Sequence, residues 1–240
     1  MSTIQPKSRM NTNKLSGREL KNKIFVLISQ KDFKKGLKEI CRLPARQAVN
    51  PLFSFLFSLD ENLKWRSITA FGEVVAPLVK CELESARIIM RRLMWNLNDE
   101  SGGIGWGSPE AMGEIMARSP RLAEEYSTIL VSYIRPDENF LGNKVLQRGV
   151  LWGLGRLAYA RSERVKQVAA FLPPFLASED PTVRGLAVWA AGALSVEKNL
   201  PFIKRLAEDR TRIKLFVDGE MIEKSIHKLV AEVLSKIDSR

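Results

Sequence analysis

The apolar positions of this chain recur with the spacing of amphipathic helices. From Leu20 they fall at i, i+4, i+7 and i+8, which places them on one face of a helix. Residues 32–42 carry a second such face, and residues 52–59 form a strongly apolar segment that follows two prolines. Residues 1–17 are polar and have no periodicity, so we expect a flexible basic tail there.

A longer period governs the chain from residue 60 onward. Four glycines define its register, at spacings of 41, 42 and 37 residues: Gly72, Gly113, Gly155 and Gly192. An apolar residue stands nine positions before each of them: Leu63, Ile104, Leu146 and Val183. A weaker copy fits residues 221–234, with Val230 in place of the glycine. Periods of this length are typical of stacked helical hairpins.

The clearest copy of the repeat is residues 179–194, EDPTVRGLAVWAAGAL. Here Asp180 is predicted to cap a helix, Pro181 to occupy its first turn, and small and apolar residues to supply the packing face. Acidic residues precede the second helix of several copies: Asp60, Asp99, Asp137 and Asp180.

This unit resembles the HEAT-like repeat of the PBS-lyase type, in which an aspartate precedes Val-Arg, small residues and a late glycine. The resemblance implies an all-α fold: a right-handed, curved α-solenoid of about five to six hairpins. We therefore expect one repeat domain over residues 18–240. The fold says little about function, because solenoids serve many partners.

Residues 98–114, NDESGGIGWGSPEAMGE, interrupt the repeat. The segment SGGIGWG makes a poor helix because each glycine costs about 1 kcal/mol relative to alanine. The helix is predicted to restart with Ser108 as its N-cap, Pro109 in the first turn and Glu110 behind it. Such departures from local rules concentrate at functional sites, so we expect a loop that opens on the concave side with Trp106 and Glu110 exposed in it.

The carboxylates around this loop allow more than one interpretation. Glu110 lies where the helix dipole stabilises an anion, and Glu114 follows one turn later on the same face. Asp99 and Glu100 precede the loop. These residues could serve a ligand, hold a divalent cation through oxygen atoms, or merely complement the helix dipole beside a tight turn.

The same stretch is also similar to the HEAT-like DNA alkylation repair glycosylases. Trp106 and Glu110 reproduce that family's Trp-xxx-carboxylate spacing, and Arg148 and Trp189 stand at matching places in later repeats. The resemblance implies that Glu110 stabilises the charge on an alkylated nucleoside and positions a water molecule. It also implies that Trp106 and Trp189 pack on the sugar and phosphate, and that Arg148 binds the backbone.

The net charge of +11 lies almost entirely at one end of the chain. Residues 1–46 hold 12 Lys/Arg and 3 Asp/Glu, whereas residues 47–199 hold 17 of each. A basic arm binds phosphates or acidic partners by counterion release, although it can equally be a solubilising segment. The tryptophans keep the repeat register and form either core between repeats or an aromatic row in the groove: Trp65, Trp106, Trp152 and Trp189.

Composition excludes several chemistries. Two cysteines and one histidine, His227, are too few for a disulfide framework, a zinc centre or a Ser-His-Asp triad. The sequence GGIGWG lacks the context of a phosphate-binding loop, so we expect no cofactor and no metal. No apolar run is long enough for a membrane span and no secretory signal begins the chain, so a cytoplasmic location is expected.

Our leading hypothesis is therefore a binding module with a concave groove centred on Trp106, Glu110, Arg148, Arg156 and Trp189. Nucleic acid is its predicted partner, through this groove and the basic residues 1–46. The alternative is a non-catalytic protein-interaction scaffold of the PBS-lyase HEAT-like type. The third hypothesis is an alkylpurine DNA glycosylase with Glu110 as its catalytic residue.

Overall fold

A computed structural model describes residues 15–97, 105–194 and 197–238 of the chain. Most of the predicted basic tail, residues 1–14, lies outside the described residues. So does the first part of the irregular loop, residues 98–104, including Asp99 and Glu100.

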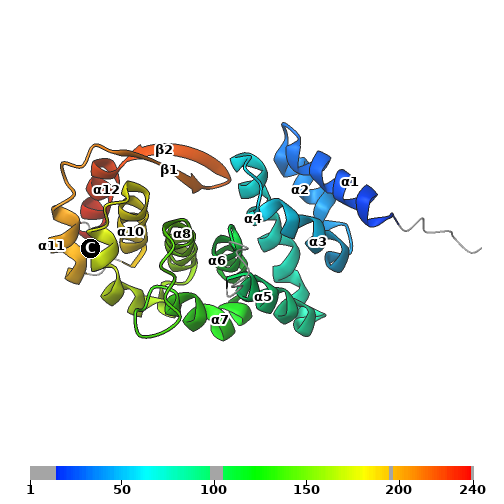
Figure 1. The fold of residues 1–240 in the computed structure, drawn as a ribbon, viewed down its shortest axis with the longest axis horizontal. Helices are drawn as coiled ribbons and strands as arrows, with labels where there is room; N and C mark the ends of the chain where they lie inside the picture. The colour runs from blue at the N-terminus through cyan, green and yellow to red at the C-terminus, as the bar shows by residue number, and fades with distance from the viewer. Residues whose placement is uncertain (1–14, 98–104, 195–196, 239–240) are drawn as a thin grey trace, which may run out of the picture.

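The described part of the chain is mainly helical (Figure 1). Its α-helices are α1 (Gly17–Ser29), α2 (Phe33–Cys41), α3 (Ala45–Leu56), α4 (Glu61–Val75), α5 (Leu83–Leu97), α6 (Ser108–Arg118), α7 (Pro120–Ser132), α8 (Lys144–Arg161), α9 (Pro173–Leu176), α10 (Pro181–Leu194), α11 (Leu200–Lys204) and α12 (Ile226–Asp238). Short 3₁₀ helices cover Ala76–Lys80, Ser162–Arg164, Lys166–Phe171 and Glu197–Asn199.

Successive helices pair into hairpins that stack along a curved array (Figure 1). Helices α4, α6, α8, α10 and α12 pack side by side as the inner row of the curve, and α3, α5 and α7 lie outside them. Together with α1/α2 and the short α9 and α11, the described residues contain six such pairs. The predicted α-solenoid of five to six hairpins is confirmed.

The repeating glycines mark where neighbouring inner helices touch. A Cβ atom on Gly113 would stand 2.4 Å from the Cα of Gly153 on the next inner helix. On Gly155 it would stand 2.5 Å from the ring of Trp189, and on Gly192 2.6 Å from Val233. Real Cβ atoms do not approach this closely, so the period found in the sequence is the period of contact between inner helices.

The cap predicted at Asp180 forms, and Asp60 caps its helix too. The Asp180 carboxylate accepts hydrogen bonds from the backbone amides of Thr182 and Val183 at 2.9 and 3.1 Å. Asp60 caps α4 in the same way, by accepting from Asn62 and Leu63. These side chains satisfy amides that have no partner within the helix.

The predicted N-cap of α6 is wrong, and α8 is capped by a residue other than Asp137. Helix α8 is capped by Asn143, while Asp137 forms an ion pair with Arg135 in the preceding loop. Helix α6 does restart at Ser108, but its N-cap is Gly107, whose φ of 77° lies in the left-handed region. Ser108 is fully buried and lies within hydrogen-bonding distance of the Asn96 amide nitrogen, 3.4 Å away. Glycine is favoured at this cap because the backbone adopts a left-handed conformation, and no side-chain hydroxyl caps the helix.

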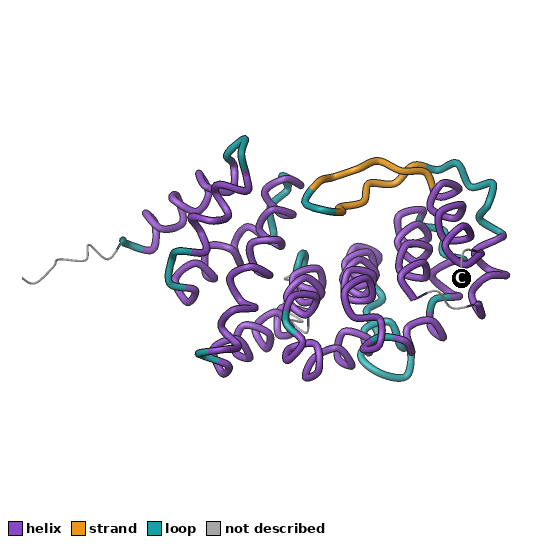
Figure 2. The backbone as a smooth tube through the Cα atoms, turned by 180° about the vertical axis from the view of Figure 1, so that it is seen from behind, coloured by secondary structure: helices purple, strands orange, loops and turns teal. Residues whose placement is uncertain are grey.

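A β-hairpin that the sequence analysis missed crosses the open side of the curve (Figure 2). Strand β1 (Arg212–Val217) pairs antiparallel with β2 (Glu220–Ser225) through the turn Asp218-Gly219. Both turn residues have positive φ, 53° and 86°, as a two-residue type I′ hairpin requires. Residues 221–225 are therefore strand, and only the second half of the predicted last repeat copy is helix.

None of the described helices combines the length and the apolar composition that crossing a bilayer requires.

Candidate functional site

The inner row of helices, α2 and the β-hairpin enclose a cavity of about 900 Å³. Every inner helix contributes to its wall: α4 through Thr69, α6 through Glu114, α8 through Arg156, α10 through Trp189 and α12 through Leu229. The hairpin contributes the opposite wall from Leu215 to Glu220. A single concave surface thus brings together residues from nearly the whole length of the chain.

Aromatic rings line one side of this cavity. Trp152 and Trp189, on neighbouring inner helices, lie with ring centroids 6.3 Å apart and 24° between planes. Phe216 of β1 stacks on Trp65 of α4 at 4.9 Å and 11°, and Trp65 in turn contacts Trp152 at 4.7 Å. Three of the four tryptophans in the repeat register, Trp65, Trp152 and Trp189, therefore lie together on the inner face beside the hairpin, and Trp106 is not among them.

A buried carboxylate organises the charges of the cavity. Glu114 is only 4% exposed, and its two oxygens accept hydrogen bonds from the Nε atoms of Arg118 and Arg156, each at 2.6 Å. Arg118 also binds Glu73 of α4 at 2.7 Å. Glu114 and Arg156, both predicted site residues, thus belong to one ion-pair network that joins three inner helices. Such a network fixes side chains and leaves little net charge.

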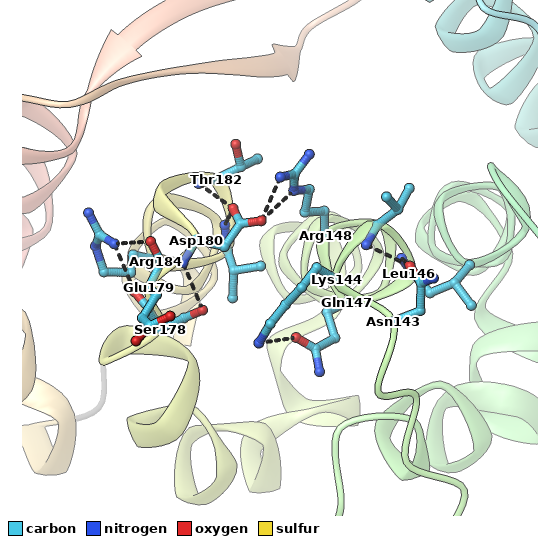
Figure 3. Close-up of polar contacts among 12 residues, drawn as sticks. Asn143, Lys144, Leu146, Gln147, Arg148, Ser178, Glu179, Asp180, Thr182 and Arg184 are labelled. Atoms are coloured by element: carbon cyan, nitrogen blue, oxygen red, sulfur yellow. Dashed lines mark hydrogen bonds and ion pairs between the residues drawn. The ribbon is translucent and has the colours of Figure 1, made fainter.

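Basic residues near the start of inner helices pair with carboxylates of the next hairpin. Arg148 of α8 binds Asp180 at 2.5 Å (Figure 3). Arg184 of α10 binds Asp209 at 2.8 Å. Burial would raise the pKa of the Asp180 carboxyl. The hydrogen bonds from Arg148 and from backbone amides outweigh that effect and hold the pKa below its ordinary value.

These pairs bear on whether the groove presents free positive charge to a nucleic acid. Arg148, Arg156 and Arg184 each have a carboxylate partner from a neighbouring hairpin. Arg148 contacts Asp180 and does not line the cavity. Of the three, only Arg156 lines the cavity, and all three hold neighbouring hairpins together.

The predicted exposure of Glu110 in the groove is wrong. Glu110 is 4% exposed, binds Lys64 of α4 at 3.0 Å, and fills the space left by the missing side chain of Gly149 on α8. Its Oε2 atom has no hydrogen-bond partner among the described residues. Trp106 is half-buried, and neither side chain lines the cavity. Glu110 turns toward α8 because a glycine there makes room for a carboxylate.

The structure therefore brings together only part of the predicted site. Glu114, Arg156 and Trp189 line the cavity, whereas Trp106, Glu110 and Arg148 do not. Neither Phe216 nor the hairpin that carries it was predicted from the sequence. The signal was present in Asp218-Gly219, a dipeptide that favours hairpins, between two alternating segments.

Comparison with known proteins agrees with this architecture. Residues 145–193 match a model of the HEAT-like repeat. An uncharacterized protein of Archaeoglobus fulgidus is 26% identical over 183 residues, which cover 76% of this chain and 93% of that one.

Two solved structures are similar over most of their length. A designed armadillo repeat protein in complex with the peptide (KR)4 superimposes with a TM-score of 0.53 at 14% identity, covering 91% of this chain and 99% of that one. An engineered protein gives 0.52 at 15% identity, covering 92% and 96%. At this identity the likeness concerns the fold alone, and it confirms a HEAT- and armadillo-like α-solenoid.

Proposed function

We propose that this protein is a non-catalytic binding scaffold that holds an extended segment of a protein partner in its central cavity. The observation that carries the proposal is the character of the cavity wall, where an aromatic row lies beside charges of both signs. A peptide offers the matching groups, because its side chains include aromatic, acidic and basic types and its backbone supplies hydrogen-bond donors and acceptors.

The fixed side chains of the wall suit this task. Glu114, Arg118 and Arg156 hold one another in place, so a ligand meets side chains that are already ordered. Preorganised groups lose less conformational entropy when they bind, which favours affinity. Trp189 is 9% exposed and lines the cavity, so its ring offers an apolar contact at the edge of these charges.

The designed armadillo repeat protein with similar fold is in complex with a peptide, (KR)4. This supports a peptide ligand by analogy of fold only. The nucleic-acid and glycosylase hypotheses gain no such support, since Arg156 in the cavity wall is paired with Glu114, and Glu110 is buried between helices.

The test is a selection of short random linear peptides against the full-length protein, followed by titration calorimetry with the enriched sequences. We expect binding that Trp189→Ala weakens at least tenfold. Trp95→Ala serves as the matched control, because Trp95 is 76% exposed on the outer helix α5. The proposal fails if no peptide is enriched, or if both variants weaken binding alike. Tighter binding of duplex DNA than of any peptide would restore the nucleic-acid hypothesis.

A further inference from the structure

The β-hairpin crosses the whole open side of the solenoid and contacts the far end of the inner row (Figures 1 and 2). It leads directly into α12, yet its side chains reach α4, about 150 residues earlier in the chain. Lys214 binds Glu61 of α4 at 2.7 Å, and Phe216 stacks on Trp65 of the same helix. The hairpin therefore bridges the two ends of the curve.

The two contacts with α4 agree in spacing. Glu61 and Trp65 are four residues apart in a helix, a rise of about 6 Å. Lys214 and Phe216 are two residues apart in a strand, a rise of about 7 Å, and their side chains share one face. One turn of α4 thus matches one Lys-x-Phe unit of an extended chain.

The backbone of the same unit is also recognised. In the hairpin register Phe216 stands opposite Met221, one pair before the turn-flanking pair Val217 and Glu220. Pairs alternate in an antiparallel ladder, so the carbonyl of Phe216 points away from β2. It accepts a hydrogen bond from the indole Nε1 of Trp152 at 2.8 Å. The inner helices thus contact both the side chains and the backbone of β1, as proteins that recognise extended peptides generally do.

Building on the proposed function, we infer that the partner peptide takes the place of β1 at one wall of the cavity, where β1 now lies in cis. We further infer that this partner is an extended segment with a basic residue two positions before an aromatic one. Glu61 selects the basic side chain, Trp65 stacks on the aromatic ring, and Trp152 binds the backbone carbonyl. A partner of this pattern competes with the outer end of the hairpin.

One of the two anchors on α4, the ion pair, is weak. The Lys214–Glu61 pair is exposed, 65% and 54%, and pairs of this kind contribute little to stability. A two-stranded hairpin is only marginally stable without packing. Its root is firmer, because Ile213 is 3% exposed and packs against Gly185 of α10. Displacing the tip from α4 therefore costs chiefly the buried contacts of Phe216 with Trp65 and Trp152, and a partner with an aromatic residue at this place replaces them.

The experiment uses the full-length protein and a fluorescein-labelled peptide, Arg-Ile-Lys-Leu-Phe-Val, which copies β1. Phe216→Ala should bind this peptide at least tenfold more tightly than the wild type, because its hairpin competes less. Lys214→Glu, an exposed change that leaves the core intact, should also strengthen binding. The same peptide with alanine in place of phenylalanine is the matched control and should bind neither protein.

A charge exchange tests the role of Glu61. In the Phe216→Ala protein, Glu61→Lys should weaken binding of the peptide at least fivefold, and a peptide with glutamate in place of its lysine should recover it. Equal affinity in the wild type, Phe216→Ala and Lys214→Glu would overturn the inference, as would indifference to Glu61→Lys. If randomly selected peptides bind in a Trp189-dependent way while the β1 peptide does not, the proposed function stands and this inference falls.

Discussion

The indole nitrogen of Trp152 donates a hydrogen bond to the main-chain carbonyl of Phe216, 64 positions later in the chain. Trp152 is 3% exposed and Phe216 7%, so water does not replace either partner easily. The bond ties the hairpin to the centre of the inner row. Hairpin and solenoid consequently form one closed structure around the cavity.

Replacement of Trp152 by phenylalanine keeps an aromatic ring and removes the donor. We expect Trp152→Phe to lower the free energy of unfolding by about 1–3 kcal/mol, because the buried carbonyl of Phe216 loses its partner. Urea unfolding measures this change, and amide hydrogen exchange should accelerate within residues 212–225. Trp95→Phe, at an exposed position of α5, should alter neither quantity. Unchanged exchange in the hairpin of Trp152→Phe would contradict the prediction.

The ion pair of Lys64 and Glu110 is the most buried of the pairs between inner helices α4 and α6, with side chains 19% and 5% exposed. Lys64→Met leaves the Glu110 carboxylate without a cation, and we expect it to cost about 3–5 kcal/mol in urea unfolding. Adding Glu110→Gln should recover much of that loss, since the uncompensated charge disappears. Lys214→Met removes an exposed pair and should have a small effect. A loss in the double variant equal to that of Lys64→Met alone would disprove the argument.

The features that the sequence predicts correctly are those that recur in every repeat or depend only on residues close together in the chain. The glycine register is visible because every copy must bring one inner helix against the next, as Gly113 meets Gly153. The cap at Asp180 is local as well, since its partners are two and three residues away. Both features follow from short-range rules that hold in each hairpin.

What the sequence does not predict depends on partners in other hairpins. The direction of Glu110 is set by Gly149 and Lys64, which lie on two different helices. The pairing of Arg148 with Asp180 is likewise a contact between hairpins. The β-hairpin was missed for another reason: the helical register of the last repeat copy was extended through residues 221–225, although Asp218-Gly219 gave a local signal against it.

Helices α6 and α8 lie so close together at Gly153 that even a methyl side chain at this position would clash. A Cβ atom there would lie 2.6 Å from the backbone oxygen of Pro109, which cannot move without its helix. We expect Gly153→Ala to lower the free energy of unfolding by about 1–3 kcal/mol, even though alanine favours helix. Gly142→Ala is the control, because no atom lies within 4 Å of its Cβ position. Stabilisation by Gly153→Ala, measured in urea, would show that the helices can separate freely.

Acid should weaken the contacts between hairpins through Asp180. Burial raises the pKa of this carboxyl, but hydrogen bonds from Arg148 and the amides of Val183 and Thr182 dominate and hold it below 3.8, the ordinary value. A carboxyl with a lowered pKa in the folded state binds protons more readily when unfolded, so its contribution to stability is complete above about pH 4. That contribution is lost as the pH falls through the lower, folded-state pKa.

The measurement is the free energy of unfolding in urea as a function of pH from neutral to strongly acid solution. Asp180→Asn keeps a good helix cap but has no charge to titrate, so we expect a shallower loss of stability below pH 4. Arg148→Gln should also flatten the curve, because it removes the cation that lowers the pKa. Parallel curves for the wild type and Asp180→Asn would mean that other carboxylates govern the acid response, with Asp209, which pairs with Arg184, the next to replace.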